Sequence, residues 1–289
     1  MGDESALQRT NHPADTSTLT ISARSSLIER GLRDLLILRE QGKTEVTAKL
    51  QSSEPSGKSE TRRPKLTPAQ MEHVIHEAEK YIQRGDHLTS EELFARGETF
   101  FSADGVPQDY AEAIVWFRGA AERYNVKAMV RLGLMYYMGW GVPQDDAASF
   151  GWYQKAAEAG YAVGQYRLGF CYRNGIGTKR DDAQAIIWDL RSAEQGYATA
   201  QSWLGSVYRG YGEGFGVPRD PQESYFWSYL AHELFTAKNE SVLAESAAEK
   251  RDKAASFLTD AALTQTQDRA KKWLEEHNAK VREQRRTHG

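Results

Sequence analysis

The chain has 289 residues, enough for one large hydrophobic core or two modest ones. It carries 37 lysines and arginines against 40 aspartates and glutamates, so its net charge of −3 gives no general attraction to nucleic acid or to an anionic membrane. Cys171 is the only cysteine, which excludes an internal disulfide and a multi-cysteine zinc site.

The N-terminal region predicts neither a secretory leader nor a membrane anchor. It begins MGDESALQRT, with acids where a signal sequence carries bases, and no apolar run follows. No apolar stretch approaches the roughly 20 residues that span a bilayer. We therefore expect a cytoplasmic protein without a membrane span, although a chain whose leader had been removed would look the same.

Residues 1–65 are predicted to form a mostly disordered arm with one amphipathic helix over about 26–41. The segments on both sides of this helix are polar and lack hydrophobic periodicity. Ser26 and Glu29 fit a capping box. One helical face carries four aliphatic side chains, those of Ile28, Leu32, Leu35 and Leu36. That face must be buried against the repeats, against a second copy in a homo-oligomer, or on a partner.

Residues 66–89 are predicted to form a capping helix ahead of a repeated region. Thr67 can cap this helix, and Pro68 sits at its first helical position. His73 and His76 could place two metal ligands on one face of it. No third ligand is evident nearby, so an ordinary polar helix is the better interpretation.

From about residue 90 the sequence repeats itself with a period of 36 residues, and this period decides the fold. Trp227 lies 39 residues after Trp188 rather than 36, because three extra residues lie between Gly205 and Gly216. Removing them restores the period, so there are four units. The recurring positions are Gly97, Gly133, Gly169 and Gly205, then Trp116, Trp152, Trp188 and Trp227, then Asp109, Asp145, Asp181 and Asp220.

Each unit is predicted to contain two helices. The recurring aspartate can cap the second helix, and the tryptophan, two turns later, should fill the gap between the paired helices. The recurring glycine lies in the middle of the first helix, where glycine costs about 1 kcal/mol relative to alanine. We therefore expect the backbone of another helix to approach closely at that glycine.

These units resemble the Sel1-like repeat, whose pattern can be written LGxxYxxGxGVxxDxxxAxxWxxxAAxxG. The second unit matches it at Leu132, Gly133, Tyr136, Gly139, Gly141, Val142, Asp145, Trp152, Ala156, Ala157 and Gly160. The resemblance covers roughly 90–235. It implies an all-α, right-handed solenoid of antiparallel helix pairs, similar to tetratricopeptide arrays, and a role as an adaptor or scaffold that binds proteins.

The repeat solenoid is predicted over 90–236, and residues 237–289 are predicted to form C-terminal capping helices with a basic tail. Helices are expected over about 241–258 and 264–280, both with many charges, as suits the wet outer face of a terminal cap. Acids interrupt the basic run near the end. A frayed, solvated helix end is therefore a better interpretation of the tail than a nucleic-acid contact.

Candidate partner-binding residues come from variable positions of the first helices. One column consists of Arg131, Arg167 and Trp203, and another consists of Tyr137, Arg173 and Arg209. Arginine and aromatic residues are favoured at binding hot spots, and the first helices of a solenoid usually line its concave face. The alternative is that some of these residues pack between repeats. The glycine-rich loop over 210–216 adds Tyr211 and Phe215.

No catalytic, cofactor-binding or metal-binding residues are predicted. The glycine-rich loop follows a helix and lacks the lysine of a phosphate-binding loop. Cys171 lies at a variable position in the middle of a helix, where a small buried residue is expected rather than a reactive thiol. No nucleophile–base pair stands out in the sequence. These observations indicate that the chain is not an enzyme.

Three functions remain as hypotheses. The first is an adaptor or regulator that binds another protein or peptide through the solenoid groove. A narrower form is a bacterial immunity or secretion-associated protein whose partner is a toxin or effector. The second is a hydrolase of cell-wall or lactam substrates, which the sequence disfavours. The third is a structural homo-oligomer formed through residues 26–41.

Overall fold

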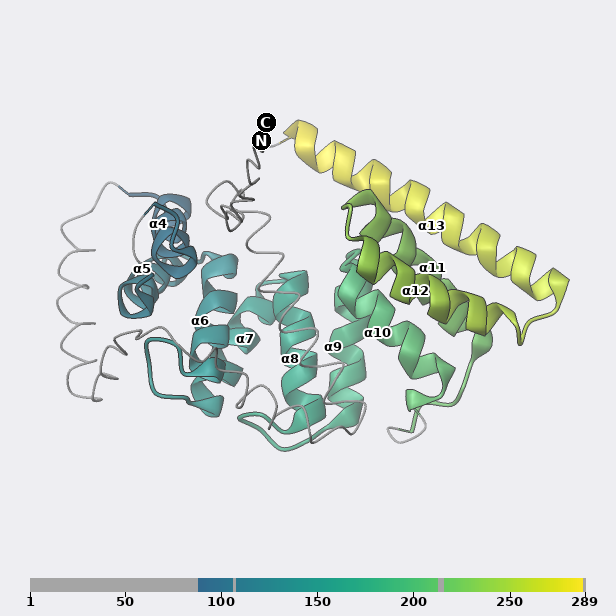
Figure 1. Ribbon diagram of the computed structural model, residues 1–289, viewed down its shortest axis with the longest axis horizontal. Coiled ribbons are helices and arrows are strands. Elements are labelled where there is room, and N and C mark those ends of the chain that lie inside the picture. Colours follow the sequence, from purple (N-terminus) through teal and green to yellow (C-terminus); the bar gives the residue numbers. More distant parts are fainter. Residues whose placement is uncertain (1–87, 106–107, 213–215, 288–289) are drawn as a thin grey trace, which may run out of the picture.

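The computed structural model describes residues 88–105, 108–212 and 216–287. Every regular element in these ranges is a helix, which confirms the predicted all-α class (Figure 1). The predicted arm over 1–65, with its helix at 26–41, lies outside the described residues, as does nearly all of the predicted capping helix over 66–89. None of the described helices is long and apolar enough to cross a bilayer.

Eight helices form four consecutive pairs, one pair for each 36-residue unit. The pairs are α4 (Ser90–Ser102) with α5 (Tyr110–Glu122), α6 (Val126–Met138) with α7 (Asp146–Glu158), α8 (Ala162–Asn174) with α9 (Asp182–Glu194), and α10 (Ala198–Arg209) with α11 (Pro221–Ala237). The helices pack within each pair, and each pair packs on the next. The units therefore follow one another along the molecule as a solenoid (Figure 1).

The recurring aspartates cap the second helices, as predicted. The side chain of Asp109 accepts hydrogen bonds from the backbone N–H groups of Ala111 and Glu112 at the start of α5. The equivalent aspartates do the same at the starts of α7, α9 and α11. Each cap satisfies backbone donors that the first helical turn would otherwise leave unpaired.

The mid-helix glycines of the first two units make room for an aromatic ring, whereas those of the third and fourth units also lie close to the backbone of the paired helix, as expected: a β-carbon added at Gly169 would be 3.1 Å from the Ala185 carbonyl oxygen, and one at Gly205 would be 3.3 Å from the Ser228 backbone nitrogen. A β-carbon added at Gly133 of α6 would lie 2.6 Å from the ring of Tyr153 in α7. At Gly97 the neighbour is the ring of Phe117, 2.5 Å away. The residue that fills this space directly follows the recurring tryptophan, and in the four units it is Phe117, Tyr153, Asp189 or Ser228.

The recurring tryptophans fill the space between helices only in part. Trp116 and Trp227 are buried, whereas Trp152 and Trp188 of the two middle units are half-buried. A cation covers the ring in both middle units, with Lys155 4.3 Å from the centre of the Trp152 ring and an arginine at a similar distance from Trp188. The predicted gap-filling role therefore fits the outer units best.

Two further helices follow the fourth unit. The helix α12 (Ser241–Ala255) packs on α11 and also touches α10, as α8 packs on α7 and touches α6. The Lys250 ammonium donates to the Ser202 hydroxyl of α10, at 2.9 Å. Glu245, Glu249 and Asp252 are exposed on the other side of α12. This helix thus occupies the place of a fifth first helix and has a charged outer face.

The last helix, α13 (Asp260–Thr287), is longer at both ends than predicted. It begins before residue 264 because the Thr259 hydroxyl accepts a hydrogen bond from the backbone N–H of Ala262 and caps the first turn. It continues past residue 280 to Thr287. Arg285 and Arg286 lie in its last turn, where cations stabilise a helix through its dipole.

Candidate protein-binding surface

The eight residues predicted as partner contacts differ in how accessible they are. Four are buried, namely Arg131, Arg167, Arg173 and Trp203. Tyr137 and Arg209 are half-buried, and Tyr211 is 48% exposed. Phe215 lies outside the described residues. The burial of the first four favours the alternative that they pack between repeats.

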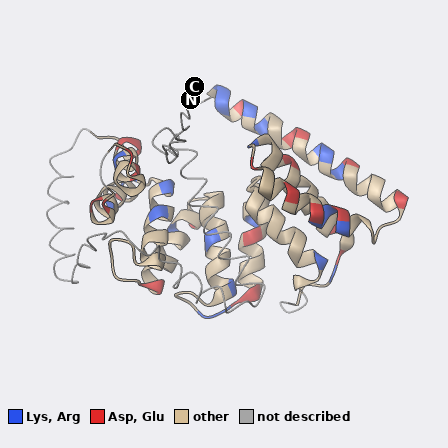
Figure 2. Cartoon of the chain, viewed as in Figure 1, with Lys and Arg blue, Asp and Glu red and all other residues tan. Residues whose placement is uncertain are grey.

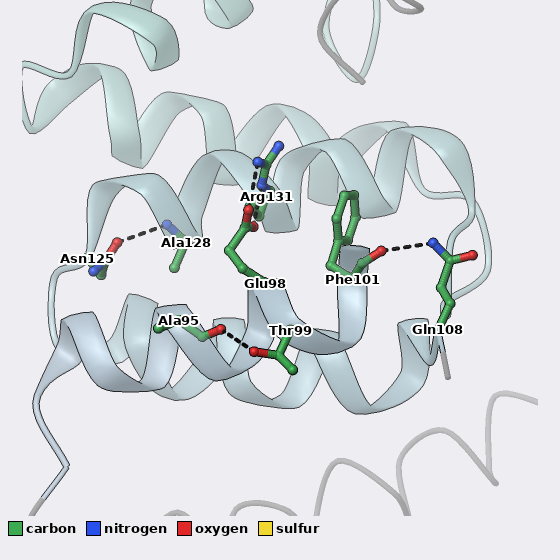
Figure 3. Close-up of polar contacts among 8 residues, drawn as sticks. All are labelled: Ala95, Glu98, Thr99, Phe101, Gln108, Asn125, Ala128 and Arg131. Atoms are coloured by element: carbon green, nitrogen blue, oxygen red, sulfur yellow. Dashed lines mark hydrogen bonds and ion pairs between the residues drawn. The ribbon is translucent and has the colours of Figure 1, made fainter. Parts of the chain in front are cut away.

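Arg131 links the first two units through a buried ion pair (Figure 3). Its Nε lies 2.6 Å from Oε1 of Glu98, and its Nη2 lies 3.0 Å from Oε2. The guanidinium also covers the ring of Phe101 at 5.1 Å. Two parallel hydrogen bonds hold both charged groups in one geometry, so this arginine joins α6 to α4.

Arg173 forms a second buried pair within the third unit. Its guanidinium binds the carboxylate of Asp189 in α9, and it lies 4.1 Å from the centre of the Trp203 ring in the fourth unit. Burial raises the pKa of Asp189 to about 6, and the charge of Arg173 opposes that rise. This cluster ties the third unit to the fourth inside the solenoid.

Arg167 lies among buried groups of the second and third units. Its charge acts on Tyr153 and on Cys171, and both are buried. Burial raises the pKa of the Cys171 thiol to about 12, so the thiol is protonated at neutral pH. This agrees with the expectation of a small, buried, unreactive cysteine.

The three accessible candidates, Tyr137, Arg209 and Tyr211, each lie near the C-terminal end of a first helix. Arg209 closes α10, and its guanidinium lies 5.9 Å from the ring centre of Tyr211, one of five large hydrophobic or aromatic residues that are clearly exposed in the described part of the chain. Tyr137 occupies the position equivalent to Arg209 in the second unit, and its ring meets that of Phe170 edge-on. We call Arg209 and Tyr211 the α10 end pair.

Two important residues were missed by the sequence analysis, the carboxylates Glu98 and Asp189. Both are buried, and each neutralises an arginine that was predicted to face a partner. Asp189 could have been found, because it stands in a column where Phe117 and Tyr153 are aromatic. A carboxylate at such a core position requires a cation nearby.

The described ranges carry mixed charge. Lysines and arginines are interspersed with aspartates and glutamates along the helices, most densely on α12 and α13 (Figure 2). No group of three or more His, Cys, Asp or Glu side chains that could hold a metal ion occurs in that part of the chain. His73 and His76 lie outside it.

The chain is similar to known repeat proteins. The Sel1 repeat model matches residues 93–125, 126–161, 162–197 and 198–234. A protective antigen of uropathogenic Escherichia coli, displaying an SLR fold, is 27% identical with a TM-score of 0.48, over 74% of this chain and 54% of that one. A Sel1 repeat protein from Oxalobacter formigenes is 37% identical with a TM-score of 0.38, over 45% of this chain and 96% of that one. This chain thus spans about half the length of the E. coli protein. No curated protein matches the sequence.

Proposed function

Because the chain belongs to the Sel1 repeat family, we propose that it is an adaptor that binds another protein or peptide on the surface of its solenoid. Stacked repeats of this kind form an extended, rigid surface and are generally protein-interaction scaffolds. The observation that supports the proposal most directly is the α10 end pair. It presents an arginine and an exposed tyrosine side by side at the end of α10.

Arginine and tyrosine are two of the three residue types most enriched at binding hot spots. Tyr211 is 48% exposed, whereas Phe226 and Trp227 of the same unit are buried. An aromatic ring left at the surface beside a cation can bury a large area on a partner at little entropic cost. The end pair is therefore the proposed centre of the contact.

The proposal can be tested by affinity capture from a lysate of the native organism, with the full-length protein as bait. A variant carrying Arg209→Glu and Tyr211→Ala should retain a specific partner at least about tenfold less well than the original protein, because a central hot spot contributes more than about 1.4 kcal/mol. Circular dichroism should show that the variant stays folded.

The matched control carries Tyr124→Ala before α6 and Lys127→Glu in its first turn. Tyr124 is 85% exposed and the Lys127 side chain is 50% exposed, so the control removes the same kinds of group at the junction of the first and second units. The control should capture the partner like the original protein. Equal capture by all three baits would place the contact elsewhere, and no capture by the original protein would contradict a binding function.

A further inference from the structure

The helix α13 leaves the register of the solenoid. In each complete unit the second helix packs closely on the first helix of the same unit, so a fifth unit would place α13 on α12. Instead α13 packs on α11, and its contact with α12 is sparse. It therefore lies on the side of the fourth unit rather than extending the array.

A narrow stripe of side chains holds α13 in place. Only Thr266 and Ala270 are buried among its 28 residues. Trp273, Leu274 and His277 are partly buried on the same face, three, four and seven residues after Ala270. All residues from Asn278 to Thr287 are exposed except Val281. This is the pattern of an amphipathic peptide helix lying on a receptor surface.

One end of the stripe is fixed by Arg269. Its guanidinium binds the carboxylate of Glu223 at the start of α11, and one of these hydrogen bonds, from Nη2 to Oε2, measures 3.3 Å. The same guanidinium lies 3.8 Å from the centre of the Phe226 ring. An acidic residue and an aromatic face on α11 thus form a receptor for one cation.

The other end is fixed at the turn between α9 and α10. The ring of His277 lies so close to Gly196 that a β-carbon added there would be 2.5 Å from its Nε2, and the ring of Trp273 stacks on the imidazole at 4.8 Å. Gly160 occupies the equivalent turn one unit earlier, and a β-carbon there would meet nothing within 4 Å. Of these two turns, only the one at Gly196 receives a ring from α13.

We propose that α13 is a releasable strap, and that the surface beneath it is a docking site for an amphipathic helix of a partner protein. The site consists of Glu223, Phe226 and the Gly196 turn. Its partner helix carries a cation, an aromatic residue four positions later and a flat ring four positions after that, as α13 does. The strap proposal rests on the proposed protein-binding function, because it requires a partner protein whose helix competes with α13 for one surface.

The first test uses the full-length protein, a labelled synthetic peptide of residues 260–287 as the probe, and fluorescence anisotropy. In the wild type the attached strap has a high effective concentration and keeps the peptide out. The variant carrying Trp273→Ala and Leu274→Ala weakens the strap but leaves the site intact. It should bind the peptide at least about tenfold more tightly than the wild type does.

A charge exchange supplies the matched control. Adding Glu223→Lys to the loosened variant should weaken binding of the original peptide several-fold, because it replaces a partly exposed ion pair by a repulsion, and a peptide carrying Arg269→Glu should restore it. Failure of the loosened variant to bind the peptide would overturn the proposal. Loss of its cooperative thermal transition would also overturn it, because α13 would then be part of the core. A dimer of the wild type that disappears in the loosened variant would assign the site to a second copy instead.

Hydrogen exchange on the wild type provides an independent measurement. A releasable strap opens without unfolding the repeats, so amides over 266–277 should exchange at least about tenfold faster than those over 224–235 in α11. Equal protection of the two helices would contradict release. Neither measurement involves the α10 end pair, so a failed capture experiment and a failed strap experiment are distinguishable.

Discussion

Single residues set how closely the paired helices approach one another. Gly133 lies in the middle of α6 and Gly151 in the middle of α7, so both carry the same intrinsic cost of glycine in a helix. Only Gly133 is explained by packing, because its missing side chain is replaced by the buried ring of Tyr153. Around Gly151 there is open space.

We therefore expect opposite effects from two alanine substitutions. Gly133→Ala should lower the free energy of unfolding by about 1–3 kcal/mol, because its β-carbon would overlap a buried ring that cannot move freely. Gly151→Ala should raise it by up to about 1 kcal/mol through helix propensity. Urea denaturation of the two variants checks both values. Stabilisation by Gly133→Ala would contradict the close packing.

The sequence period predicted where Gly133 lies but not what it faces. The spacing indicates that there is no room for a side chain at Gly133. Either a neighbouring backbone or a bulky ring could fill that space. The ring of Tyr153 belongs to the position after the recurring tryptophan, which varies among aromatic, acidic and small residues. A variable column gives a weaker repeat signal than an invariant one, so its packing role was missed.

Pairs of helices are joined by charges as well as by apolar packing. The pair Arg131–Glu98 connects α6 to α4 with side-chain exposures of 11% and 5%. The same two helices are joined by Lys127 and Glu91, 3.4 Å apart, with exposures of 50% and 65%. The two pairs differ mainly in their exposure to water, and this exposure decides how much each pair contributes to the free energy of unfolding.

Removing one charge from each pair should therefore have unequal effects. Glu98→Gln leaves Arg131 buried without its countercharge and should cost on the order of 3 kcal/mol of unfolding free energy. Glu91→Gln changes an exposed pair and should cost less than about 1 kcal/mol. Thermal unfolding followed by circular dichroism compares them. Similar losses in the two variants would mean that water reaches Glu98.

At this scale the sequence predicted the helix pairs and their aspartate caps, because both depend on local patterns that recur in each unit. It did not predict which arginines face inward. The orientation of Arg131 depends on Glu98, which lies 33 positions earlier in the chain. Only the stacking of one unit on the next brings these two residues together.

For the whole molecule, the buried carboxylate of Asp189 should couple stability to pH. Its pKa is about 6 in the folded chain against an ordinary 3.8, so the folded state binds the proton more strongly than the unfolded state. The contribution of this group to stability is therefore greatest at acid pH and is lost as the pH rises from about 4 to about 6.5.

The difference in unfolding free energy between the original protein and Asp189→Asn should follow this course. It should fall by up to about 3 kcal/mol between pH 4 and pH 6.5 and stay level above that, because the asparagine variant lacks the titrating group. Chemical denaturation at constant ionic strength across this range measures the difference. A difference that rises with pH would show that Arg173 outweighs burial.

The position of Cys171 has a practical consequence for experiments on the intact molecule. Its thiol is fully buried and stays protonated at neutral pH, so thiol-directed dyes and spin labels should not react with it. No second native cysteine competes for the label. Cysteines placed on the exposed ends of α13 and α10 can therefore be derivatised in the natural background, and single-molecule energy transfer could then follow the last helix in real time.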